Sequence, residues 1–196
     1  MQEIESLKKQ QNKEMQKQYF RLMLTAALII GVLSMVPSYI LYIIGVQGED
    51  VPGYSWINTI YLLAIFVATY IYIGKQAREV KDPDGKAGYS YGQAYGFAIL
   101  SAVLSSLVMC ALTWLLTNVL APEMMQQALD QAESTLLTQM PDASQNIIDT
   151  QMKMMRYMFS FTGLLVTSLF SMAIWGGLAG LISSAFVKRE PVIEQQ

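Results

Sequence analysis

The chain has 196 residues, of which 53% are hydrophobic and 14% charged, whereas soluble domains carry roughly 25% charged residues. Its formal net charge of -2 argues against nucleic acid as a partner, because no basic domain is present to neutralise phosphates. The lack of histidine removes the commonest general base and transition-metal ligand, and a single cysteine excludes an intramolecular disulfide. We therefore expect one domain, residues 1–196, without a metal or other cofactor.

Charged residues are absent from four long windows of the sequence. Each window exceeds the roughly 20 apolar residues that a helix needs to cross a bilayer. A backbone in lipid must satisfy its own hydrogen bonds, so the windows should be helical, and a soluble bundle would need polar helix faces that they lack. The sequence predicts an all-α membrane protein with four transmembrane helices in one bundle. The expected spans are about residues 22–46, 54–73, 92–120 and 157–187.

The first 21 residues are polar, and the apolar run that follows them is too long for the core of a signal peptide. We expect an uncleaved first span, with the polar segment continuing helically into the membrane. Pro37 should kink this span, because proline removes a backbone hydrogen bond. Residues 47–53 form an acidic turn, after which Asn58 and Thr59 are polar members of the second span.

The connection between the second and third spans contains the run Asp-Pro-Asp-Gly from Asp82 to Gly85, which is typical of a type I turn. A calcium loop is excluded, because its sixth and twelfth positions would be Ala87 and Gln93 instead of glycine and glutamate. Ser90 followed three residues later by Gln93 fits a capping box at the start of the third helix.

Small residues repeat at intervals of four in the third and fourth spans. This spacing places them on one helix face, where a second helix can approach closely. We expect leucine at Gly92 or Gly96 to loosen the bundle or abolish assembly. The small residues are Gly92, Ala94, Gly96, Ala98, Ser101, Ala102, Ser105 and Ser106 in the third span, and Gly163, Thr167, Ser171, Ala173, Gly177, Gly180 and Ser184 in the fourth.

The segment 121–156 is the largest between spans. Apolar residues recur at helical spacing between Pro122 and Pro141, and a second helix is expected to start at about Ala143 and to run into the fourth span. Together they predict an amphipathic helical hairpin. Its methionines suit adaptable apolar packing better than Cu(I), since no histidine or cysteine lies nearby. Its acids are spread along the helices, so we expect a solvated face and not an acid–base pair.

The basic residues predict the orientation. All but two of the 13 lysines and arginines lie in the N-terminal segment, the connection between the second and third spans, and the C-terminal tail. The exceptions, Lys153 and Arg156, lie in the segment 121–156 among several acids. Cytoplasmic loops carry an excess of basic residues, so both termini should be cytoplasmic and the predicted hairpin should face outward.

Two stretches resemble a known bacterial membrane family. Residues 88–96 read Gly-Tyr-Ser-Tyr-Gly-Gln-Ala-Tyr-Gly, and residues 177–189 read Gly-Leu-Ala-Gly-Leu-Ile-Ser-Ser-Ala-Phe-Val-Lys-Arg. They are similar to domain of unknown function 4199, a four-span family found chiefly in Bacteroidetes, and the likeness covers roughly residues 18–189. The resemblance implies a location in the bacterial inner membrane and adds no ligand or catalytic residue.

These patterns favour a non-enzymatic structural or accessory membrane protein that contacts lipid and associates with itself or with another membrane component. We expect no catalytic residue, and Cys110 is interpreted as a packing residue because it lies inside an apolar span. The alternative is a transporter or channel for a neutral or lipophilic solute. Its lining would consist of Asn58, Thr59, Ser101, Ser105 and tyrosines.

Overall fold

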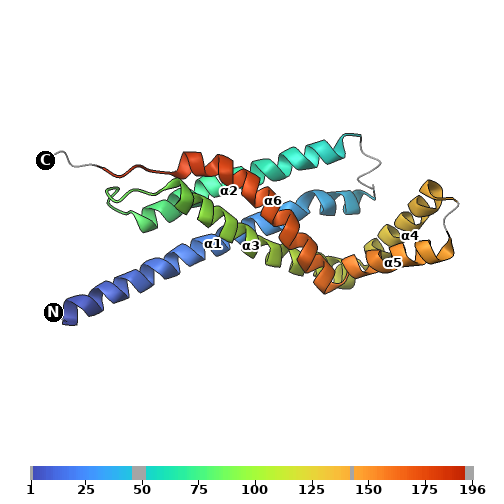
Figure 1. Cartoon of the computed structure of the whole chain (residues 1–196), viewed down its shortest axis with the longest axis horizontal. Helices are drawn as coiled ribbons and strands as arrows, with labels where there is room; N and C mark the ends of the chain where they lie inside the picture. Colours follow the sequence, from blue (N-terminus) through green and yellow to red (C-terminus); the bar gives the residue numbers. More distant parts are fainter. Residues whose placement is uncertain (1, 46–51, 142–143, 193–196) are drawn as a thin grey trace.

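The structure is a computed structural model, and its described residues are 2–45, 52–141 and 144–192 (Figure 1). Helices make up nearly all of this part of the chain, apart from its turns and an isolated antiparallel pairing of Tyr89 with Arg189. In chain order the elements are α1 (Gln2–Ile44), α2 (Tyr54–Lys81), α3 (Tyr91–Leu115), a π-helical segment η2 (Leu116–Leu120), α4 (Pro122–Gln139), α5 (Gln145–Met158) and α6 (Phe161–Val187).

Within the described residues, four helices are long and apolar enough to cross a membrane: α1, α2, α3 together with η2, and α6. Between 22% and 33% of the most apolar 18-residue window of each helix is buried inside the protein. An apolar helix with most of its surface exposed is stable in lipid and not in water. The prediction of a multi-pass, all-α membrane protein is therefore confirmed.

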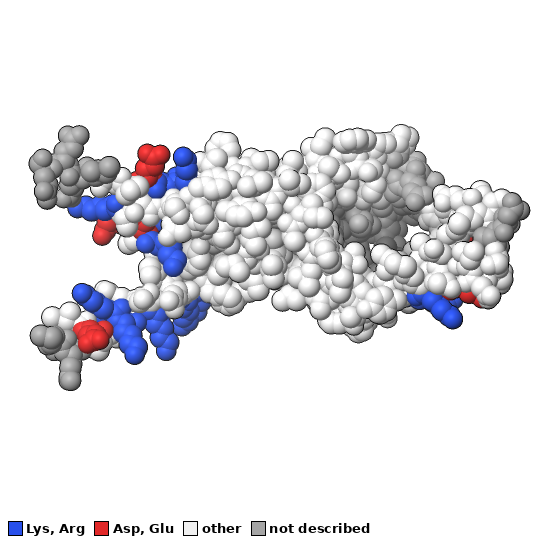
Figure 2. All heavy atoms as spheres, viewed as in Figure 1, with Lys and Arg blue, Asp and Glu red and all other residues white. Residues whose placement is uncertain are grey.

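The two ends of the bundle differ in charge. Figure 2 shows that lysines and arginines gather at the end formed by the N-terminal part of α1, the α2–α3 connection and the C-terminal segment. We call this the basic end, and the other end, where α4 and α5 lie, the α4–α5 end. Most of the length between the two ends carries neither acids nor bases on the visible face, as a bilayer-spanning surface requires (Figure 2).

The helix boundaries confirm one expectation about the first span. The polar N-terminal segment and the first apolar window form the single helix α1, as predicted. Pro37 lies inside α1, whose final turns run in a different direction from the rest of the helix in Figure 1. α2 continues beyond its predicted end to Lys81. The acidic turn predicted at residues 47–53 lies largely outside the described residues.

The fourth span begins later than predicted. α5 does not run on into the span; it ends at Met158, and α6 starts at Phe161. Ser160 caps the new helix, because its hydroxyl oxygen accepts the backbone N–H of Gly163 at 3.2 Å. A Cβ atom at Gly163 would collide with the carbonyl oxygen of Tyr157, so the break also requires a residue without a side chain. The chain turns here instead of continuing as one long helix.

The four long helices form a ring in the order α1, α2, α6, α3, and the interface between α3 and α6 is the most extensive. α2 and α3 are consecutive in the chain but lie across the bundle from each other, with a smaller contact. This arrangement brings apolar side chains of all four helices into one core. The largest buried cluster consists of Ile30, Phe66, Tyr70, Ala98, Met172 and Ala179.

Small residues set the separation of α3 and α6. A Cβ atom added to Gly176 would collide with the Cβ atom of Ala102. One added to Gly180 would lie 3.0 Å from the Cβ atom of Ala98. The two helices therefore approach one another at two successive turns, with room only for glycine at Gly176 and a tight contact at Gly180. This confirms that small residues pack the third and fourth spans together.

Gly180 was predicted correctly, but the prediction for Gly92 and Gly96 of the third span is wrong. Gly92 is exposed, and nothing lies within 4 Å of a Cβ atom at Gly96, so the bundle does not need glycine at either position. Ala173 is likewise exposed on α6. Because α3 presents Ala98 and Ala102 to α6, the glycine stripe on the same helix is turned away from the interface.

We predict that Gly176→Ala destabilises the bundle by about 1–3 kcal/mol, the usual cost of forcing extra methyl groups into a packed interface. Reversible unfolding of the purified protein in mixed micelles measures this. Gly177→Ala is the matched control, because its Cβ atom would make an ordinary contact, 3.7 Å from the hydroxyl oxygen of Tyr95. Equal stabilities of the two variants would show that the α3–α6 distance is not set by Gly176.

Candidate functional site

The α2–α3 connection is fixed by one buried carboxylate. Asp82, only 3% exposed, accepts the backbone N–H groups of Ala87 at 3.0 Å and Gly88 at 3.1 Å. A β-turn is present at the predicted position, since the N–H of Gly85 donates to the carbonyl oxygen of Asp82 at 3.2 Å. Gly88 has a φ of 79°, and a Cβ atom there would lie 2.7 Å from the nitrogen of Pro191. The connection thus packs tightly against the C-terminal segment.

The C-terminal segment closes this arrangement from the other side. Tyr89 and Arg189 exchange backbone hydrogen bonds of 2.8 Å in both directions. The guanidinium group of Arg189 lies 2.6 Å from the carboxylate of Glu79 and 3.8 Å from that of Asp82. We call Glu79, Asp82, Gly88, Tyr89 and Arg189 the clasp. It joins the end of α2, the start of α3 and the chain after α6.

The clasp also reaches α1. The hydroxyl groups of Tyr89 and Tyr19 are 2.9 Å apart, and the Tyr89 hydroxyl donates to the carbonyl oxygen of Gln93 at 3.3 Å. Burial raises the pKa of the Tyr89 hydroxyl, so this residue remains a neutral hydrogen-bonding group. The ammonium group of Lys81 lies 4.9 Å from the centre of the Tyr19 ring, a cation–π distance. All four long helices are therefore tied together at the basic end.

One of the serines predicted to line a pore, Ser105, makes a hydrogen bond within its own helix instead, as does Ser184 on α6. The Ser105 hydroxyl donates to the carbonyl oxygen of Ser101 at 2.8 Å, and Ser184 does the same to Gly180 at 2.6 Å. Such bonds to the preceding turn satisfy a hydroxyl group without a partner helix or a solute. The Ser101 hydroxyl differs, because it is buried and has no hydrogen-bond partner among the described residues.

The four pore candidates do not share one depth in the bundle. A Cβ atom at Gly176 would lie 3.2 Å from the Tyr70 hydroxyl and would also meet Ala102, so Tyr70 sits at the level of Ala102 and its neighbouring serines. Asn58 precedes Tyr70 by twelve residues, which is about 18 Å along a helix. Asn58 and Thr59 are half-buried near the start of α2, away from the two buried serines.

α4 and α5 pack against each other through one side of each helix. Leu129, Ile148 and Met152 form a buried cluster, against which Met155 packs. α5 begins at Gln145, close to the predicted start at Ala143, which lies outside the described residues. The methionines of the cluster pack as apolar side chains, and the described residues contain no group of three histidine, cysteine, aspartate or glutamate residues placed to hold a metal.

A second apolar side of α5 has no partner among the described residues. Ile147, Met154 and Met158 are 47%, 63% and 44% exposed, and they recur at intervals that place them on one helix face. Asp149 and Lys153 occupy the polar side of the same helix. α5 therefore has a wide apolar arc, of which α4 covers only a part.

α4 is anchored to α1 at the point where it leaves η2. The hydroxyl group of Tyr42 donates to a carboxylate oxygen of Glu123 at 2.5 Å. This hydrogen bond holds the pKa of Glu123 below its usual value, so the carboxylate stays ionised in the first turn of α4. A negative charge at this position is also favoured by the helix dipole. The contact holds the first turn of α4 next to the end of α1.

Most of the chain matches one protein family. Residues 25–189 match the family described as protein of unknown function (DUF4199). The chain belongs to this family. The match begins inside the apolar part of α1 and ends at Arg189, so the DUF4199 region includes part of the first span, the other three spans and the whole clasp. No curated protein and no solved structure matches the chain.

The sequence predicted the turn at Asp82 and the capping box at Ser90 but not the clasp. Both cap hydrogen bonds of the box are present, at 3.2 Å from Gln93 N–H to the Ser90 hydroxyl and 2.8 Å from Ser90 N–H to the Gln93 side chain. Arg189 lies more than a hundred residues from Asp82 in the chain, so local spacing carries no sign of their contact. The basic residue after an apolar span indicated only a membrane boundary.

We predict that Asp82→Asn destabilises the DUF4199 protein by about 1–3 kcal/mol, because the amide cannot accept both backbone N–H groups and loses the attraction to Arg189. Limited trypsin digestion should then cleave faster at Lys86 inside the connection. Asp84→Asn is the control, since Asp84 is exposed in the same turn. If both variants resist trypsin as the parent does, the carboxylate of Asp82 does not hold the connection.

Proposed function

We propose that this protein is a non-enzymatic accessory protein of the bacterial inner membrane, and that it binds another membrane component through the exposed apolar side of α5. The proposal rests on the exposed apolar face formed by Ile147, Met154 and Met158, which has no partner among the described residues. Methionine-rich apolar surfaces are typical of adaptable binding sites for partner helices. The polar side of α5 keeps the helix soluble until a partner covers the apolar side.

The proposed orientation places both termini in the cytoplasm and the α4–α5 pair outside. It is supported by the gathering of lysine and arginine at the basic end in Figure 2, since short cytoplasmic loops carry an excess of these residues. In this orientation α5 stands beyond the membrane, where a partner protein can reach it. In the proposed accessory role, neither the clasp nor the core has to bind a substrate.

The interior of the bundle supports the accessory role over a transporter or channel. Small residues bring α3 into direct contact with α6 at Gly176 and Gly180, which leaves these helices packed against each other. Most serine hydroxyls along this interface bond to their own helix. A solute path would need polar groups that face a common space, and Asn58 and Thr59 lie about 18 Å from the buried serines.

The test replaces exposed α5 residues with a photo-activated cross-linking amino acid in cells. We expect a probe at Met154 to yield one discrete protein adduct, and a probe at Lys153 on the polar side to yield none. The double variant Ile147→Lys and Met154→Lys should weaken co-purification of that partner by about tenfold or more, because each buried apolar side chain contributes about 1.5–3 kcal/mol.

The double variant should retain its stability, since both side chains are exposed. Absence of adducts at Ile147, Met154 and Met158, together with extraction of the chain alone, would contradict the proposal. Measurable solute flux through liposomes containing the purified chain would then favour the transporter alternative.

A further inference from the structure

The N-terminal part of α1 carries a regular row of cations. Lys9, Lys13, Lys17 and Arg21 follow one another at intervals of four, so they lie along one side of the helix. All four are exposed, and none of them has an ion pair among the described residues. Like charges at this spacing destabilise a helix, which makes an anionic partner along the row favourable. We call these four residues the basic row.

The basic row lies on the side of α1 that faces lipid. Phe20, Leu24 and Leu28 are 49%, 38% and 54% exposed on the same helix. Lys13 and Phe20 are seven residues apart, as are Lys17 and Leu24, and seven residues are close to two helical turns. The basic row therefore continues directly into the apolar side that α1 presents to the hydrocarbon, and Phe20 lies where the two meet.

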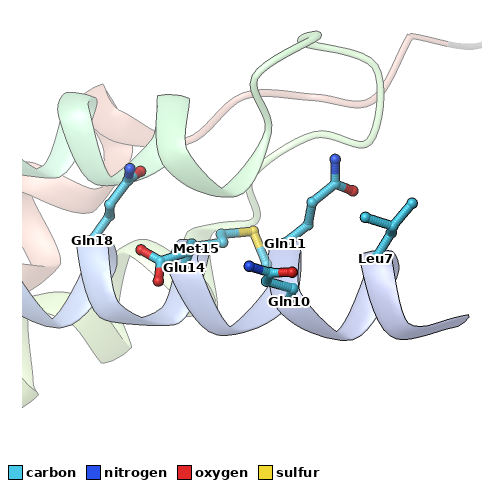
Figure 3. A pocket seen from close by; sticks show the side chains of 6 residues that line it. All are labelled: Leu7, Gln10, Gln11, Glu14, Met15 and Gln18. Carbon is cyan, nitrogen blue, oxygen red and sulfur yellow. The ribbon is translucent and has the colours of Figure 1, made fainter. Parts of the chain in front are cut away.

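The neighbouring side of α1 is different in character. Figure 3 shows the side chains that line a shallow depression along the helix, and none of them is a cation. In Figure 2 the blue side chains of this part of α1 gather along its outer edge, away from the α2–α3 connection and the C-terminal segment. The depression is lined by Leu7, Gln10, Gln11, Glu14, Met15 and Gln18.

We propose that the basic row binds the phosphate headgroups of anionic phospholipids in the leaflet at the basic end of the bundle. Arg21 immediately precedes the apolar window of α1, so Arg21 and Lys17 stand at headgroup level, and Lys13 and Lys9 follow within the diffuse field of the surface. Two arginines at this end are already engaged: Arg189 binds Glu79, and Arg78 binds both Glu79 and the carbonyl oxygen of Val187. The side chains of the basic row remain exposed and can contact the membrane surface.

The full-length protein is purified from nanodiscs made of equal parts phosphatidylglycerol and phosphatidylcholine, and the retained lipids are measured by mass spectrometry. We expect retained lipid to be enriched in phosphatidylglycerol. The variant Lys9→Gln, Lys13→Gln, Lys17→Gln and Arg21→Gln should lower the enrichment by at least about fivefold, which corresponds to the loss of one contact of about 1 kcal/mol. Enrichment should also fall with added salt, because salt screens the surface charge.

A control variant moves the cations without changing composition. It combines Lys13→Gln and Lys17→Gln with Gln11→Lys and Gln18→Lys, which transfers two charges to the side shown in Figure 3. We expect this variant to lose enrichment although its net charge is unchanged. Enrichment equal to that of the parent chain would overturn the basic row as the binding site.

A competition experiment distinguishes binding of lipid headgroups from binding of free anions. Inorganic phosphate should displace no more phosphatidylglycerol than chloride does at the same ionic strength. Preferential displacement by phosphate would identify a soluble-anion site and contradict the proposal. These readouts do not involve α5, so they succeed or fail independently of the proposed partner.

Discussion

The contact between α3 and α6 is the constraint on which the rest of the bundle depends. In lipid the hydrophobic effect does not drive one apolar helix against another, so close packing and hydrogen bonds must hold the helices together. Gly176 and Gly180 allow α6 to approach Ala102 and Ala98 of α3, where dispersion contacts are most numerous. α1 then packs on one flank of this pair and α2 on the other, which closes the ring.

The clasp complements this contact at the basic end. The helix pair fixes the distance between α3 and α6, whereas the clasp fixes where the α2–α3 connection and the C-terminal segment lie relative to each other. Asp82 does this with one buried carboxylate that binds two backbone N–H groups and faces Arg189. At the α4–α5 end, the hydrogen bond between Tyr42 and Glu123 is an exposed link, so the α4–α5 pair has fewer constraints.

The sequence predicted those features that depend on composition or on neighbouring residues. Four windows without charge gave the four spans, and Ser90 with Gln93 gave the start of α3. Of the two interface glycines, Gly180 was predicted but Gly176 was not, because spacing defines a face and does not say which face meets a neighbour. Gly176 and Gly177 are adjacent, and only the position of α3 distinguishes them.

Contacts between residues far apart in the chain were not predicted either, because local spacing does not show which elements meet. The pairing of Asp82 with Arg189 joins residues on different helices, and neither residue carries a local sign of the other. The break before α6 did have a local signal, since Ser160 is a typical N-cap residue. The break was not predicted, because residues 157–187 contain no charged residue and therefore looked like one continuous span. The exposed side of α5 became visible only when α4 was placed against the neighbouring part of its apolar arc.

Disulfide cross-linking in native membranes tests the α3–α6 contact most directly. In a Cys110→Ser background, cysteines at Ala98 and Gly180 should form a disulfide under mild oxidation, because the two Cβ atoms lie close together. After trypsin cleavage between α3 and α6, the two fragments should then stay joined until a reductant is added. The pair Gly96→Cys with Gly180→Cys is the control and should not cross-link. Fragments that separate in the first pair, or that stay joined equally in both, would contradict the packing on which this account rests.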